Sequence, residues 1–114
     1  MESPKAIHLG PVGNEIIDWG NIDSPIGSQI SSVSGYLLDK SENHEMGYWQ
    51  CSEGEWDCHV TKNEFCHFIE GECIYTSEDG SIINISSGSI AFFPKDWNGK
   101  CKVVKKIKKF YCIF

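Results

Sequence analysis

The chain has 114 residues, 40% of them hydrophobic, and its 10 basic and 16 acidic side chains give a formal net charge of −6. This length fits a single domain that can bury a core without a metal or a disulfide. The negative charge and the absence of arginine argue against nucleic-acid binding, because arginine supplies the planar fork that contacts phosphate and guanine.

Nothing in the sequence suggests export or membrane insertion. The N-terminal stretch MESPKAIHLG has no apolar run behind a basic start, and the longest clearly apolar run, IAFF, is too short to span a bilayer. The 6 cysteines are widely spaced and form no CxxC pair, so we expect reduced, small buried side chains. We therefore expect a soluble cytoplasmic protein that has no membrane partner.

In chain order, residues 1–35 are irregular and predict loops with one or two peripheral strands. Turn formers then separate short runs rich in β-branched and aromatic residues, a pattern typical of an all-β sandwich or barrel. These runs span residues 35–38, 47–51, 55–60, 64–70, 72–76, 81–85, 89–93, 100–104 and 108–114. The clearest hairpin is IYTSEDGSIINI, in which Asp79 and Gly80 are expected to supply the positive φ angles of a tight turn.

Lysines are concentrated near the C-terminal end of the chain. We expect them to solvate the outward face and the ends of two late strands, where lysine also discourages aggregation at a sheet edge. This group comprises Lys100, Lys102, Lys105, Lys106, Lys108 and Lys109.

The stretch WDCHVTKNEFCHFIEG raises the possibility of a metal site. Strand alternation places Trp56 and Cys58 on one face and Asp57 and His59 on the other. In a plain sandwich the apolar face would point inward, whereas in a barrel with a polar cavity Asp57, His59 and Glu64 would converge inside. Periodicity alone leaves both arrangements open.

The same stretch resembles the first motif of the cupins, in which Gly, five residues and His-x-His precede a Glu and, six residues later, a Gly. Here Asp57-x-His59 is followed by VTKN, Glu64, FCHFIE and Gly71, so the spacing matches. Asp57 replaces the first histidine, and Cys51 stands in place of the leading glycine.

The second cupin motif is also recognisable in part. Gly88 and Pro94 are kept, whereas Asp96 replaces the inner glycine, Gly99 the histidine and Val103 the asparagine. GYWQCSEGEW, NEFCHFIEGECIYTSEDG, SSGSIAFFPKDWNGKCKVV and KKIKKFYCIF look like the cupin group related to (S)-ureidoglycine aminohydrolase.

The resemblance implies an all-β, double-stranded β-helix (a cupin jelly-roll barrel), commonly dimeric, in a one-domain chain. Residues 36–114 would form the barrel, and residues 1–35 would pack on it as an N-terminal segment. The implied orientation places Asp57, His59 and Glu64 inside, where they could hold manganese, zinc, iron or nickel. Because the usual ligand set is incomplete, we expect no bound cofactor and keep a divalent metal as the alternative.

Two functions follow from the resemblance. The first is a module that binds a small polar metabolite in the barrel, and the second is a metal-dependent enzyme acting on a small nitrogenous or carbonyl compound. The expected pocket consists of Asp57, His59, Glu64, Cys66, Phe68, Tyr75 and Trp97. Without a metal, Asp57, Glu64 and His59 could still exchange protons, but no nucleophile has an obvious activating partner.

Overall fold

The computed structural model describes residues 3–9 and 15–114. Within these ranges no residue is helical, and so no described helix could cross a membrane. The strands are β1 (Ile17–Asn21), β2 (Pro25–Ile26), β3 (Ser32–Lys40), β4 (Glu45–Cys51), β5 (Gly54–His59), β6 (Glu64–Ser77), β7 (Ile82–Ile85), β8 (Ile90–Phe93) and β9 (Asn98–Ile113). The prediction of an all-β fold is confirmed.

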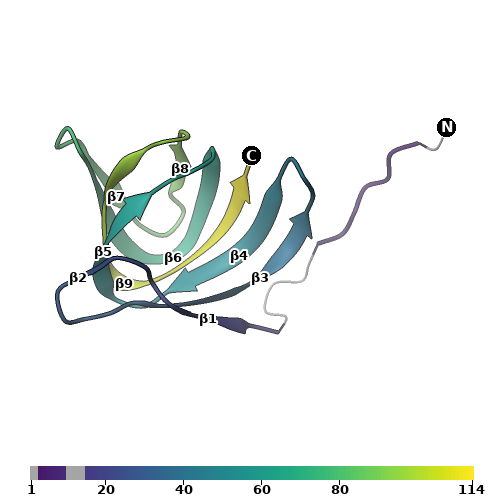
Figure 1. Cartoon of the computed structure of the whole chain (residues 1–114). Helices are drawn as coiled ribbons and strands as arrows, with labels where there is room; N and C mark the ends of the chain where they lie inside the picture. The colour runs from purple at the N-terminus through teal and green to yellow at the C-terminus, as the bar shows by residue number, and fades with distance from the viewer. Residues whose placement is uncertain (1–2, 10–14) are drawn as a thin grey trace.

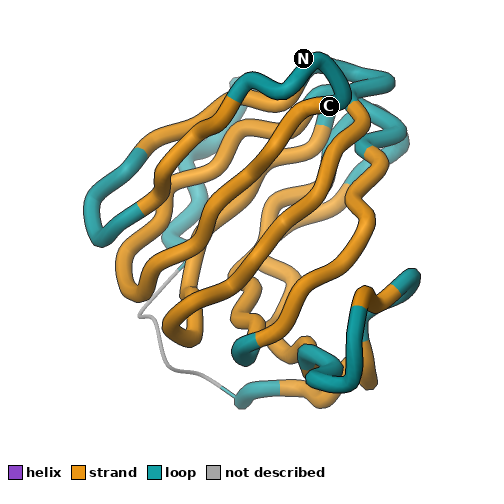
Figure 2. The backbone as a smooth tube through the Cα atoms, turned by 90° about the vertical axis from the view of Figure 1, so that its left-hand side faces the viewer, coloured by secondary structure: helices purple, strands orange, loops and turns teal. Residues whose placement is uncertain are grey.

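Strand β9 lies at the centre of the sheet. One of its edges pairs first with β5 and then with β4, and its other edge pairs with β6. Strand β6 also pairs with β7 and β8, while β3 and β1 extend the sheet beyond β4, and β2 extends it beyond β5. All these pairings are antiparallel, and the strands curl around one interior, as Figures 1 and 2 show.

Strands β6 and β9 are longer than the sequence runs suggested. Residues 64–70 and 72–76 belong to one strand, as do residues 100–104 and 108–114 up to Ile113. The register between β6 and β9 shifts at Phe68/Glu70, Glu70/Glu72 and Glu72/Cys73. Bulges bend a strand without ending it, which lets each long strand serve both halves of the curled sheet.

Gly71 lies in the middle of this bend with a φ of 97°. A Cβ at this position would lie 2.1 Å from the carbonyl oxygen of Lys106. Only glycine combines this backbone conformation with such a close approach of β9. The final glycine of the first motif therefore has a backbone role.

The turn between β6 and β7 is close to the one expected. The Ser77 N–H donates to the Ser81 carbonyl, and the Gly80 N–H donates to the Ser77 carbonyl. Gly80 has a φ of 90°, whereas Asp79 does not have a positive φ and instead accepts hydrogen bonds from Ser81. One positive φ suits a type I turn followed by a bulge, so the expectation of two was wrong.

The core is built from aromatic, β-branched and cysteine side chains. All six cysteines are free, and four of them are buried: Cys51, Cys66, Cys73 and Cys101. These thiols pack as small hydrophobes, as the sequence predicted.

Candidate functional site: a pocket inside the barrel

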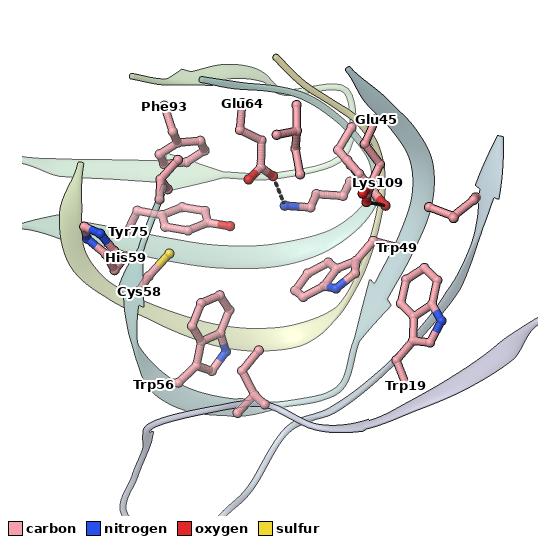
Figure 3. Close-up of a pocket in the computed structure, with 15 residues that line it drawn as sticks. Trp19, Glu45, Trp49, Trp56, Cys58, His59, Glu64, Tyr75, Phe93 and Lys109 are labelled. Atoms are coloured by element: carbon pink, nitrogen blue, oxygen red, sulfur yellow. Dashed lines mark hydrogen bonds and ion pairs between the residues drawn. The ribbon is translucent and has the colours of Figure 1, made fainter. Parts of the chain in front are cut away.

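The concave side of the curled sheet encloses a pocket of about 520 Å³ (Figure 3). Most of its wall is aromatic or aliphatic, and the polar groups lie among these side chains. It is lined by Trp19, Ile22, Leu37, Glu45, Trp49, Trp56, Cys58, His59, Val60, Glu64, Tyr75, Phe93, Lys109, Tyr111 and Ile113. Such a mixture of apolar walls and few polar groups is typical of small-molecule sites.

Strand β5 presents its apolar face to this pocket. Trp56 is buried and packs edge-on against Trp49 at 6.3 Å between ring centroids, and Cys58 also lines the pocket. Asp57 is exposed on the opposite face. The expectation that Asp57 points into the barrel was wrong, because burying an indole is favourable whereas burying an unpaired carboxylate is costly.

His59 lies at the boundary between the pocket and an outer hollow. Its Nδ1 is hydrogen-bonded to Oδ1 of Asn98, at the start of β9. It lines the pocket and also, with Asp57, a smaller hollow of about 390 Å³ on the outside. His59 therefore shares a surface with Asp57 as alternation predicted, but this shared surface lies outside the barrel.

The most polar part of the pocket is an ion pair between Glu64 and Lys109. Lys109 is only 6% exposed, and its Nζ lies 2.9 Å from Oε2 of Glu64 and 3.5 Å from the sulfur of Cys66. The ammonium also stands 4.5 Å from the ring centroid of Trp49 and 5.5 Å from that of Phe68. The cation thus sits between aromatic faces that favour positive charge.

The pair keeps both of its members charged. Burial raises the pKa of Glu64, but the adjacent Lys109 ammonium more than offsets this and holds the pKa below the ordinary value. Burial lowers the pKa of Lys109, but Glu64 reverses this effect, so that the lysine pKa lies above its ordinary value. Lys109 is therefore an ammonium at neutral pH and a poor nucleophile.

A second polar contact lies between β4 and β9. The Tyr111 hydroxyl donates to Oε2 of Glu45 at 2.7 Å, and Oε1 of Glu45 lies 3.8 Å from Nζ of Lys40. Burial, together with Glu45, raises the pKa of Tyr111 above its ordinary value. Both carboxylates that line the pocket thus have cationic or hydroxyl partners.

The residues in the barrel do not form a metal-ligand set. Glu64 is engaged by Lys109, Asp57 faces outward, and His59 is bonded to Asn98. Among the described residues, no group of three or more His, Cys, Asp or Glu side chains could hold a metal ion. The set Asp57, His59 and Glu64 expected from the resemblance is not assembled.

The other predicted pocket residues lie in the barrel at different depths. Tyr75 lines the pocket, and Figure 3 shows its hydroxyl pointing toward the centre. Cys66 and Phe68 are fully buried beside Lys109 and do not line it. Trp97 packs behind Tyr75 and Phe93, with ring centroids 6.0 and 5.2 Å away, respectively.

Lys109 was expected on the outer surface, and that expectation was wrong. In β9, Ile107, Lys109 and Tyr111 alternate on the buried face, whereas Lys105, Lys106 and the other strand lysines are exposed or half-buried. The alternation in IKKFY indicated that Lys109 is buried. Residues two apart in a strand point to the same face, and Lys109 is two residues from both Ile107 and Tyr111. Trp19, Trp49 and Trp56 were also not predicted as pocket residues.

An antiparallel sheet curled into a barrel around an inward-facing pocket is the architecture of the cupins. The family model described as the EutQ-like cupin domain matches residues 38–111, and the chain belongs to this family. No functionally curated protein matches the chain.

Solved structures agree with this assignment at the level of the fold. The EutQ protein of Clostridium difficile is 21% identical with a TM-score of 0.66, over 74% of this chain and 68% of that one. A Pseudomonas syringae protein of unknown function from the DUF861 family is 19% identical with a TM-score of 0.78; the alignment covers 88% of this chain but only 44% of that protein. A DUF861 protein from Thermotoga maritima is 33% identical with a TM-score of 0.58, over 59% and 76% of the two chains.

Proposed function

We propose that this chain is a binding module whose barrel pocket holds a small amphipathic molecule. The observation that carries the proposal is the pocket of about 520 Å³, which combines indole, phenyl and aliphatic walls with the buried Glu64–Lys109 pair. Aromatic walls provide contact area, and a few fixed polar groups orient the ligand.

The state of the reactive groups favours binding over catalysis. Lys109 is held as an ammonium, and burial raises the pKa of the Cys58 thiol in the pocket wall to about 12. Neither group is an activated nucleophile at neutral pH. The alternative, a metal-dependent enzyme of the ureidoglycine-aminohydrolase kind, lacks support from the donor set in the barrel.

The proposed setting is the cytoplasm. All six thiols are free, which suits a reducing compartment. A homodimer, implied by the resemblance, stays a prediction that sedimentation equilibrium would test.

The binding function can be tested with the tryptophans that the chain already carries. Three of its four tryptophans, Trp19, Trp49 and Trp56, line the pocket. We expect compact flat fragments from a mixed panel of amides, acids and amines to change the tryptophan fluorescence in a saturable way, with ligand-observed NMR as the second readout.

The Trp19→Ala variant, compared with Ile17→Ala as its control, tests whether the fragments bind in the pocket. Both residues lie on β1 and are partly exposed, but only Trp19 lines the pocket. Loss of one aromatic contact should weaken binding about threefold to tenfold in Trp19→Ala and leave Ile17→Ala unchanged. Equal affinity in the wild type and both variants would show that the fragments bind outside the pocket. If no fragment binds, the proposed function is rejected.

A further inference from the structure

The Glu64–Lys109 pair has unused hydrogen-bonding capacity. Oε2 of Glu64 accepts from Lys109 at 2.9 Å and from the Cys66 thiol at 3.1 Å. Oε1 of Glu64 has no hydrogen-bond partner in the described part of the chain, although it belongs to a residue that lines the pocket. An ammonium carries three N–H donors, and only two of those on Lys109 face Glu64 and Cys66.

The charges that face the pocket are already balanced. Glu64 is paired with the buried Lys109, and Glu45 is contacted by Tyr111 and Lys40 near the surface. A ligand with a net charge would bring an uncompensated charge into a pocket with mostly apolar walls. Such a charge loses its hydration without gaining a counterion, which is strongly unfavourable.

The walls favour a flat ligand body. Trp49 and Trp56 meet edge to face, and Tyr75 and Phe93 lie with their ring centroids 4.7 Å apart. All four rings line the pocket, and in the view of Figure 3 Tyr75 and Trp56 lie to the left of Trp49 and Lys109. A planar group placed among these rings would contact aromatic faces and edges on several sides.

We propose that the ligand is a flat, uncharged molecule with an amide-like group, in which an N–H donor stands next to a carbonyl oxygen. The N–H donates to Oε1 of Glu64, and the carbonyl accepts from Nζ of Lys109. Amides, lactams and related heterocycles have this pattern, whereas carboxylates lack the donor and amidinium ions lack the acceptor. The inference rests on the proposed function, because it specifies the ligand of the same pocket.

Benzamide, benzoate and benzamidinium test this inference, since the three have nearly the same shape and differ in charge and hydrogen-bonding pattern. We expect benzamide to bind wild-type protein at least about tenfold more tightly than either ion, as measured by tryptophan fluorescence and ligand-observed NMR. The Trp19→Ala and Ile17→Ala variants show whether the signal comes from the pocket.

Charge variants should change this preference in opposite directions. Lys109→Met leaves the Glu64 carboxylate unpaired and should favour benzamidinium, whereas Glu64→Gln leaves the ammonium unpaired and should favour benzoate. The double variant Glu64→Gln/Lys109→Met restores neutrality and should again prefer benzamide over both ions. Because a single variant can fail to fold, the wild-type ranking and the double variant carry the test.

The outcomes separate the two proposals. Tighter binding of either ion by wild-type protein, or binding of other panel fragments without benzamide, overturns the amide inference and leaves the binding function standing. If no fragment of the panel binds, both proposals fail.

Discussion

A lysine ammonium that is 6% exposed needs compensation from within the protein, and Lys109 obtains it from Oε2 of Glu64 at 2.9 Å. The pair joins the N-terminal end of β6 to the C-terminal half of β9, and the register places Glu64 opposite Ile113, four residues beyond Lys109. The contact is therefore a long-range one, which requires the pairing of β6 with β9. Its strength can be measured apart from any ligand.

A double-mutant cycle should show strong coupling between these two residues. Lys109→Met and Glu64→Gln should each lower the free energy of unfolding by about 3–5 kcal/mol, because each leaves a buried charge unpaired. The double variant should lose much less than the sum, since its two remaining side chains are neutral. Chemical denaturation of all four proteins checks this prediction, and additive losses would contradict a paired state.

The same pair predicts how stability changes with pH. The folded-state pKa of Glu64 lies below its ordinary value, so its contribution is complete above about pH 5 and is lost as pH falls through the folded pKa. The pKa of Lys109 is raised, so its contribution is present below about pH 10 and is lost as pH rises through the folded pKa. The unfolding free energy of wild type minus that of Glu64→Gln/Lys109→Met should be flat between these limits and fall at both extremes. A difference that stays constant down to about pH 2 would contradict the pairing of Glu64.

At the scale of elements, β6 and β9 determine the shape of the pocket, because both continue through a bend. Gly71 supplies the backbone conformation for that bend, and its φ of 97° is combined with the nearby Lys106 carbonyl. Gly80 has a similar φ of 90°, but a Cβ there would meet nothing within 4 Å. An alanine at Gly80 would therefore add backbone strain alone, whereas an alanine at Gly71 would add both backbone strain and steric overlap.

Gly71→Ala should therefore be far more destabilising than Gly80→Ala. We expect a loss of about 2–5 kcal/mol for Gly71→Ala, from strain plus displacement of β9, and about 1 kcal/mol for Gly80→Ala, from strain alone. Thermal and urea unfolding of the two variants checks the difference. Equal losses of stability in the two variants would show that β9 can move away at Lys106 without a cost in free energy.

The sequence predicted which segments form strands better than it predicted which face of each strand points into the barrel. Alternation correctly grouped Glu64, Cys66 and Phe68 on one face of β6 and indicated most of the strands. It could not tell which face of β5 points inward, because a barrel interior can be polar or apolar, and the choice made from resemblance placed Asp57 on the wrong side. Lys109 was missed because lysine is usually exposed, although its position between Ile107 and Tyr111 predicted burial.

At the scale of the whole molecule, the cysteines report on closure of the barrel. Cys51, Cys66, Cys73 and Cys101 lie in β4, β6 and β9 and are at most 1% exposed. Cys58 and Cys112 are half-buried. A thiol reagent can therefore distinguish the intact barrel from states in which these strands have separated.

Native protein treated with such a reagent near pH 8 should be modified at no more than two thiols, Cys58 and Cys112, before it unfolds. Cys58 should react slowly, because burial raises its pKa to about 12 and leaves little thiolate. The four buried thiols, which lie along strands paired through β9, should react together at the rate of global unfolding, and all six should react at once in denaturant. Mass spectrometry of timed samples identifies the modified residues. Early modification of Cys73 or Cys101 alone would contradict cooperative closure. It would mean that the β6–β9 pairing opens at the end that holds these two cysteines while the other end, which holds Glu64 and Lys109, stays closed.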